Sequence, residues 1–366
     1  EYFSIEQELL LLEQNSIYRN YSGPDKDQNI RAIFERLKEL RVLMNAFFEV
    51  NEIKELYRQF TLTHENQRES LEEIRNKIAL FQNPNGSVRI GIIYDYLQVL
   101  VSIYSEGLDE QIGRIANFFN TYNSSKDKAP YPQIFDIVFH LYFSWYLLLI
   151  EAKKFDETNG VETKMLSFFH EQTTFRQRKV YPRILNARLE RHRKQKNKEE
   201  ALKVTQEARK EFRKVGINEN ARPFITFSFF SGKTLFEMGY YSEAKKWLSK
   251  LVNSKPLSIK PIFTPLANLI SAMIEYERGD LEELHKMVRF GKRYLKKHGS
   301  DTHFFNSLFD ELDKKSRGQQ PDFDKLYELS KKLQITGPGS SILDYFAFDL
   351  WLKAKITGVN MLDLMN

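Results

Sequence analysis

Residues 232–244 read GKTLFEMGYYSEA, and a proline follows at position 256. This stretch predicts a helix, a tight turn and a second helix that runs back along the first. Gly232 and Ala244 are small enough for two antiparallel helices to approach closely, and Gly239 can end the first helix without a Cβ clash. Pro256 blocks continuation of the second helix. The stretch therefore predicts a helical hairpin whose contact is made by small residues.

The hairpin resembles a tetratricopeptide repeat (TPR). The small, aromatic and proline positions of that pattern are occupied by Gly232, Leu235, Gly239, Tyr241, Ala244, Leu248 and Pro256. Ser228 and Ser231 depart from it, since the pattern prefers Trp and Leu there. The resemblance is clearest over 225–258 and extends in weaker form over 180–297. It implies an α-α superhelix, a TPR-like solenoid of antiparallel helix pairs; a non-repeating bundle that contains one such hairpin is the alternative.

The remaining chain has the same helical character. Apolar residues recur three and four positions apart, with breakers about every 15 to 25 residues, which predicts an all-α fold. N-terminal helical hairpins are expected over 1–122 and a TPR-like repeat region over 131–357, unless the two form one continuous solenoid. A capping helix is expected to start at Ser341, with Asp344 completing a capping box. Helices are expected near 2–20, 27–46, 49–60, 66–82, 88–105, 108–122, 131–154, 161–174, 180–196, 198–214, 221–238, 242–253, 260–278, 280–297, 302–315, 321–333 and 341–357.

Composition is that of an ordinary globular chain without cysteine. The 366 residues are 42% hydrophobic and 28% charged, with a net charge of +6. The lack of cysteine excludes disulfides, thiolate-bound zinc and a cysteine nucleophile. It favours a reducing compartment, so a cytoplasmic location is expected. A secreted or periplasmic location stays open, because the chain starts at Glu1 rather than Met and an upstream segment is expected.

The longest apolar run, residues 134–150, is expected to be a buried helix. It falls short of the roughly 20 residues that cross a bilayer, and it contains Asp136 and His140. We therefore expect no transmembrane segment in this chain.

Positive charge is concentrated between residues 174 and 214, where 15 Lys or Arg residues stand against 5 Glu. Such density attracts phosphates, acidic peptide segments or anionic lipid heads. The members of the predicted basic patch are Arg183, Arg188, Arg191, Arg193, Lys194 and Lys196. The alternative is a solvated helix face whose charges pair with nearby Glu residues at helical spacing. Few aromatic residues lie nearby, so there is little for nucleic-acid bases to stack on.

Motifs for catalysis and cofactor binding are absent from the sequence. It contains no glycine-rich dinucleotide loop, no Walker loop, no H-E-x-x-H and no G-x-S-x-G. The seven histidines are mostly far apart, so a metal site would need carboxylates from elsewhere in the fold. We therefore expect no catalytic residue, no metal and no cofactor, and we expect that the protein is not an enzyme.

The resemblance places a binding groove along the first helix of each pair. Residues three and seven apart on three of these helices would face a ligand: Thr226, Phe229, Lys233, Phe236, Leu266, Leu269, Met273 and Tyr276, preceded by Arg183, Asn186, Glu190 and Arg193. The predicted function is a non-catalytic interaction scaffold that binds a peptide or protein partner, one with an acidic segment. Two alternatives stay open. These side chains belong to the core, or the chain is a nucleic-acid-binding or sensor domain of a larger transcriptional regulator that uses segment 174–214.

Overall fold

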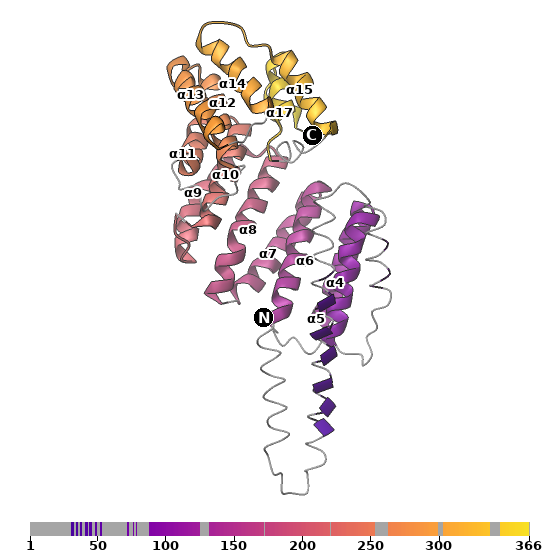
Figure 1. Cartoon of the computed structure of the whole chain (residues 1–366). Helices are drawn as coiled ribbons and strands as arrows, with labels where there is room; N and C mark the ends of the chain where they lie inside the picture. The colour runs from indigo at the N-terminus through magenta and orange to yellow at the C-terminus, as the bar shows by residue number, and fades with distance from the viewer. Residues whose placement is uncertain are drawn as a thin grey trace. The chain divides into compact units, whose positions relative to one another are not determined.

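The computed structural model describes most of the chain beyond residue 87. The described ranges are 88–124, 132–171, 173–219, 221–252, 263–298, 303–336 and 345–365, together with separate positions between 31 and 78. The chain forms two compact units, residues 1–168 and 169–366 (Figure 1). The boundary suggested by the sequence, between 122 and 131, falls inside the first unit.

All regular secondary structure in the described residues is α-helical, which confirms the all-α prediction. The first unit contains α4 (Val88–Ser105), α5 (Leu108–Ser124), α6 (Pro132–Glu151) and α7 (Phe155–His170), whose last two residues belong to the second unit. The second unit contains α8 (Thr174–Lys194), α9 (Lys198–Lys214), α10 (Arg222–Glu237), α11 (Tyr241–Val252), α12 (Phe263–Arg278), α13 (Leu281–His298), α14 (His303–Ser316), α15 (Phe323–Thr336), α17 (Phe348–Thr357) and α18 (Met361–Leu364). Described positions between 31 and 78 are also helical, whereas the helix expected near 2–20 lies outside the described residues.

Helix α6 packs in the core of the first unit. Its Phe135 ring stacks on Phe168 of α7, with the centroids 5.3 Å apart. Tyr146, which is fully buried, donates a 2.8 Å hydrogen bond from its hydroxyl to Glu162 of α7. These contacts confirm the buried helix expected over 134–150. In the ranges given above, no helix has both the length and the apolarity to cross a membrane.

One turn geometry recurs between successive helices. One or two positions after the helix end, a residue has a left-handed φ of 56° to 83°: Lys153, Lys196, Gly239, Gly279 and Gly318. After α10, the amide of Tyr240 donates to the carbonyl of Leu235 at 2.8 Å, and the amide of Gly239 donates to that of Phe236 at 2.9 Å. The same pair of hydrogen bonds, a Schellman motif, closes all five turns. These five residues follow one another after 43, 43, 40 and 39 positions, so a turn of this kind recurs in successive helix pairs along the chain. Gly216, with a φ of 70°, makes the same pair of hydrogen bonds after α9.

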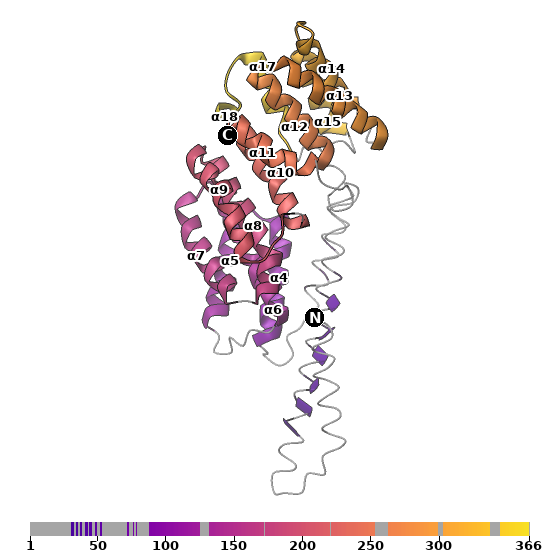
Figure 2. The same ribbon diagram turned by 90° about the vertical axis from the view of Figure 1, so that its left-hand side faces the viewer.

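Helices α10 and α11 approach most closely at Gly232. A Cβ built on Gly232 would lie 2.5 Å from Cγ of Leu248 and 3.3 Å from the carbonyl oxygen of Ala244, which is itself buried. The small-residue contact predicted from the sequence is therefore present. Figure 2 shows the pairs α8/α9, α10/α11 and α12/α13 following one another within the second unit. Helices packed in neighbouring pairs are the arrangement expected of a helical repeat.

Helices α7 and α8 begin earlier than expected from the sequence. Helix α7 starts at Phe155 instead of 161, and α8 starts at Thr174 instead of 180. Gly160 lies inside α7 and Pro182 inside α8, so neither residue acts as a breaker here. Local breaker signals are overridden when tertiary packing favours continuing the helix.

Helix α17 is shorter than the helix expected over 341–357. It begins at Phe348, and Ala347 at its N-cap makes no side-chain hydrogen bond. The expected cap residues Ser341 and Asp344 lie outside the described residues. Residues 345–347 are not helical, and the ring of Tyr345 lies 5.3 Å from that of Phe263.

Candidate functional site

Most of the predicted groove residues lie in the core. Five of them are at most 2% exposed: Phe229, Phe236, Leu266, Leu269 and Met273. The other three, Thr226, Lys233 and Tyr276, are partly exposed. A ligand cannot touch covered side chains, so the open groove expected over those five residues is corrected to a packed interior.

The C-terminal segment of the chain, residues 345–365, packs against these helices. The ring of Phe346 lies 5.7 Å from that of Phe236, and Trp351 donates from Nε1 to Glu277 of α12 at 2.7 Å. In Figure 1, α17 lies to the right of α12, whereas α13 lies to its left. The ring of Tyr276 on α12 also meets that of Trp351 on α17 edge to face, with the centroids 5.9 Å apart, so α17 packs against the end of α12.

Helices α8 and α10 keep a face that is partly open. The residues follow one another at steps of three and four along each helix, as the members of one helical face do. They are Arg183, Asn186, Glu190 and Arg193 on α8 and Arg222, Thr226, Phe230, Lys233 and Glu237 on α10. All except Glu237 are at least partly exposed. We call this set the polar face.

Four charged side chains join α8 to α10 within the polar face. Arg193 donates to Glu190 from Nε at 2.7 Å and again from Nη2. Its Nη1 lies 3.7 Å from Oε2 of Glu237, and Nζ of Lys233 lies 3.7 Å from Oε1 of the same carboxylate. Burial raises the pKa of Glu190, but the hydrogen bonds and charge of Arg193, with the charge of Lys233, outweigh it and hold that pKa below its ordinary value. Glu190 is therefore ionised at neutral pH.

Three buried acceptor atoms of the polar face make no hydrogen bond with the described residues. They are both carboxylate oxygens of Glu237 and Oδ1 of Asn186. The two cations near Glu237 stand 3.7 Å away, which is too far for a hydrogen bond. A buried acceptor without a donor costs free energy. These three atoms lie beneath the surface of the face, where the charge of Glu237 is balanced by Arg193 and Lys233.

Phe230 gives the polar face an apolar contact point. Its side chain is partly exposed, while the rings of Phe229 and Phe263, 5.5 and 6.0 Å away, are buried behind it. Aromatic side chains fixed by a packed core serve as anchors at many interfaces. The face therefore combines an aromatic anchor with charged and hydrogen-bonding groups.

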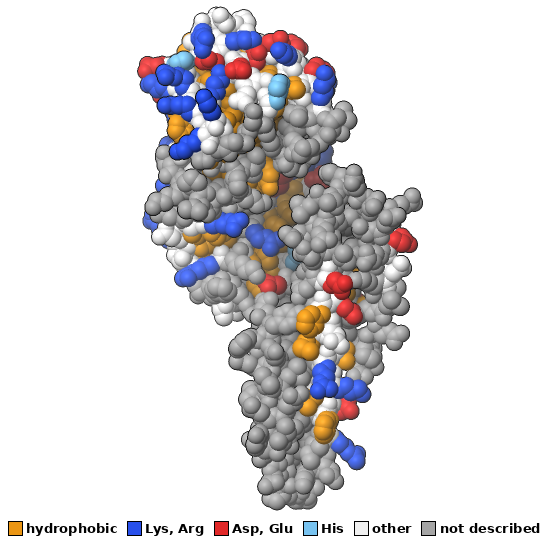
Figure 3. Space-filling view, in the orientation of Figure 1, with side chains coloured by type: hydrophobic (Ala, Val, Ile, Leu, Met, Phe, Trp, Pro, Cys, Tyr) orange, Lys and Arg blue, Asp and Glu red, His pale blue; other side chains and the backbone are white. Residues whose placement is uncertain are grey.

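The predicted basic patch is divided among different surfaces. Arg183 is exposed on the polar face, whereas Arg188 lies about 140° further round α8. Lys196 is exposed in the left-handed turn after the helix. The partly exposed members are Arg188, Arg191, Arg193 and Lys194. On the side of the molecule seen in Figure 3, the described Lys and Arg side chains are interspersed with acidic and apolar ones.

Glu237 and Phe230 were missed because the sequence-based stripe followed other steps along α10. It ran from Thr226 through positions 229, 233 and 236, whereas the open face runs through 226, 230, 233 and 237. The signal that could have found Glu237 is its spacing of four residues from Lys233, which places opposite charges side by side on a helix.

Metal binding has no candidate cluster in the described ranges, since no three His, Cys, Asp or Glu side chains are grouped so that they could hold an ion. Comparison of the chain with family models, curated proteins and solved structures finds no match in any of the three.

Proposed function

We propose that the protein is a non-catalytic, TPR-like interaction module that binds an extended acidic segment of a partner protein across the polar face. The observation that carries this proposal is the partly exposed ring of Phe230, which lies on the same face as the accessible cationic side chains of Arg183, Arg193, Arg222 and Lys233. A cytoplasmic protein would fit the chain's lack of cysteine.

The charges of the face favour an acidic partner. Four cationic side chains, Arg183, Arg193, Arg222 and Lys233, stand against the two carboxylates Glu190 and Glu237. Carboxylates on the partner would form charge-assisted hydrogen bonds with the cations, and an apolar residue between them would pack on Phe230. The recurring left-handed turns support the TPR-like arrangement, because one kind of turn repeats in successive helix pairs, as it does in a helical repeat.

Selection from a phage-displayed library of short random peptides tests the proposal. We expect the purified chain to select peptides rich in Asp and Glu with an apolar residue among them. Binding of a selected peptide, measured by fluorescence polarisation, should weaken roughly 30-fold in Phe230→Ala, because loss of an interface anchor commonly costs 2 kcal/mol or more. Lys233→Gln should weaken it as well. The matched controls on α13, Phe290→Ala and Lys286→Gln, should bind as the wild type does, since both residues are exposed outside the polar face.

Unchanged affinity in both polar-face variants would overturn the proposal. The same preparations are titrated with single-stranded and duplex oligonucleotides at several salt concentrations. Tight oligonucleotide binding with a steep salt dependence, and no peptide selected, would replace the proposal by the nucleic-acid alternative.

A further inference from the structure

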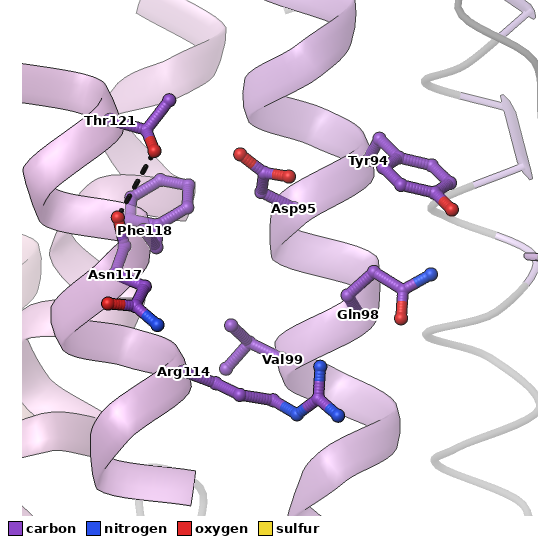
Figure 4. Close-up of a pocket in the computed structure, with 8 residues that line it drawn as sticks. All are labelled: Tyr94, Asp95, Gln98, Val99, Arg114, Asn117, Phe118 and Thr121. Carbon is purple, nitrogen blue, oxygen red and sulfur yellow. Dashed lines mark hydrogen bonds between the residues drawn. The ribbon is translucent and has the colours of Figure 1, made fainter.

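A cavity of about 360 Å³ lies between α4 and α5 in the first unit (Figure 4). Its residues follow helical spacing on both elements, so one face of each helix forms a wall. The lining residues are Tyr94, Asp95, Gln98 and Val99 of α4 and Arg114, Asn117, Phe118 and Thr121 of α5. A cavity of this size is in the range of small-molecule sites.

The cavity has an apolar floor and a polar rim. Val99 and Phe118 are buried, whereas Arg114, Asn117 and Thr121 are exposed. Asp95 is partly exposed, and in Figure 4 its carboxylate points from α4 toward α5. A ligand could therefore lay a short carbon chain on the floor while its polar end stays near Asp95.

Asp95 gives the cavity a negative charge that no cation among the described residues balances. Arg114 is neutralised by Glu106, which accepts hydrogen bonds from its Nε at 2.5 Å and from its Nη2. Asp95 itself has neither an ion pair nor a hydrogen bond with the described residues, and partial burial raises the pKa of its carboxyl. A carboxylate held partly out of water without a partner binds a cation more strongly than a fully solvated one does.

We propose that this cavity binds a small organic cation, a primary ammonium or guanidinium group on a short carbon chain. The cation pairs with Asp95 through charge-assisted hydrogen bonds. Asn117 of α5 has a side-chain carbonyl group to accept a further N–H donor. The hydroxyl of Thr121 donates to the backbone carbonyl of Asn117 at 3.2 Å, so its oxygen is left to accept as well.

The same cationic group occurs in free amines and in the Lys or Arg side chains of peptides. Agmatine serves as the free probe, and N-acetyl-lysine methylamide as the probe for a side chain within a peptide. Isothermal titration calorimetry with the full chain should show saturable 1:1 binding of one or both. Butanol, which has a carbon chain but no charge, should not bind.

Variants connect that binding to the cavity. Asp95→Asn keeps the shape of the side chain and removes its charge, so binding should weaken about tenfold or more. The control Asp156→Asn makes the same charge change at an exposed position of α7 outside the cavity and should leave affinity unchanged. Asn117→Leu, at the exposed rim, should also weaken binding, and it stands in for Asp95→Asn if circular dichroism shows that this variant is misfolded.

Absence of saturable heat with both probes at millimolar concentration would overturn the proposal. Equal affinity in the wild type and a folded Asp95→Asn would overturn it too. Neither result bears on the polar face, which lies in the other unit.

Discussion

Gly232 shows how one side chain sets the spacing of a helix pair. A methyl group there would sit 2.5 Å from Cγ of Leu248, so that side chain or the helix would have to move. We expect Gly232→Ala to lower the free energy of unfolding by about 1–3 kcal/mol through overpacking. At Gly160, a helical position with open space around it, the same change should instead raise stability by roughly 0.5–1 kcal/mol.

Urea unfolding of the two glycine variants measures both effects. A gain in stability in Gly232→Ala would mean that α10 and α11 are not in contact at this residue. The prediction of a helical hairpin from residues 232–244 would then be wrong.

Phe236 and Phe230 belong to the same helix, but Phe236 lies in the core and Phe230 at the surface. Phe236 is 2% exposed and packs on Phe346, whereas Phe230 is partly exposed. We expect Phe236→Ala to cost about 3–5 kcal/mol of stability, as truncation of a buried phenylalanine does. Phe230→Ala should cost about 1 kcal/mol, the common value for a point mutation. Thermal melts of the two variants measure these losses of stability. Equal losses would contradict the assignment of Phe230 to the polar face.

At the scale of elements, the stability of the recurring left-handed turn depends on which residue occupies it. A left-handed φ is costly for residues with a Cβ, by roughly 1–2 kcal/mol, and almost free for glycine. Lys196 and Gly239 occupy equivalent turns with φ of 56° and 83°. We therefore expect Lys196→Gly to raise stability by roughly 1 kcal/mol and Gly239→Ala to lower it by roughly 1–2 kcal/mol.

Chemical denaturation measured by circular dichroism checks these opposite signs. Both variants should keep the helical content of the wild type, because only the turns between helices are changed. A loss of stability in Lys196→Gly would contradict the equivalence of the two turns.

Helix ends were predictable where the sequence marks them with glycine. The expected boundaries of the two helices around Gly239 are within one residue of α10 and α11. Lys153 and Lys196 carry no such mark, because lysine gives no local sign of a left-handed conformation. The repeat interval that joins α6/α7 to α8/α9 was therefore visible only once the backbone was known.

At the scale of the whole molecule, the candidate site depends on contacts that local patterns do not contain. The spacing rule correctly found Thr226 and Lys233 on the open side of α10. It also assigned Phe236 there, because nothing within α10 shows that residue 346 covers this position. Likewise, Arg193 donates from Nη1 to Sδ of Met365 at 3.7 Å, a contact between residues 172 positions apart. Helical periodicity identifies a face but not what covers it.

The division of charge follows the same reasoning. Segment 174–214 is basic in sequence, yet folding places Arg183 and Arg188 on different sides of α8 and pairs Arg193 with Glu190. The summed charge of a segment therefore overstates the charge that a single partner can contact. The polar face has four cations and two carboxylates, so the net charge that it presents to a partner is smaller than that of the whole segment.

Photo-cross-linking tests the central claim, that a partner segment lies on the polar face of α8 and α10. The photoreactive side chain p-benzoylphenylalanine replaces Phe230 in one protein and Phe290 of α13 in another, and each is irradiated with the selected acidic peptide. We predict a covalent adduct from position 230 and none from position 290. Adduct formation at 290 without any at 230 would contradict the account, because the peptide would then lie away from the polar face.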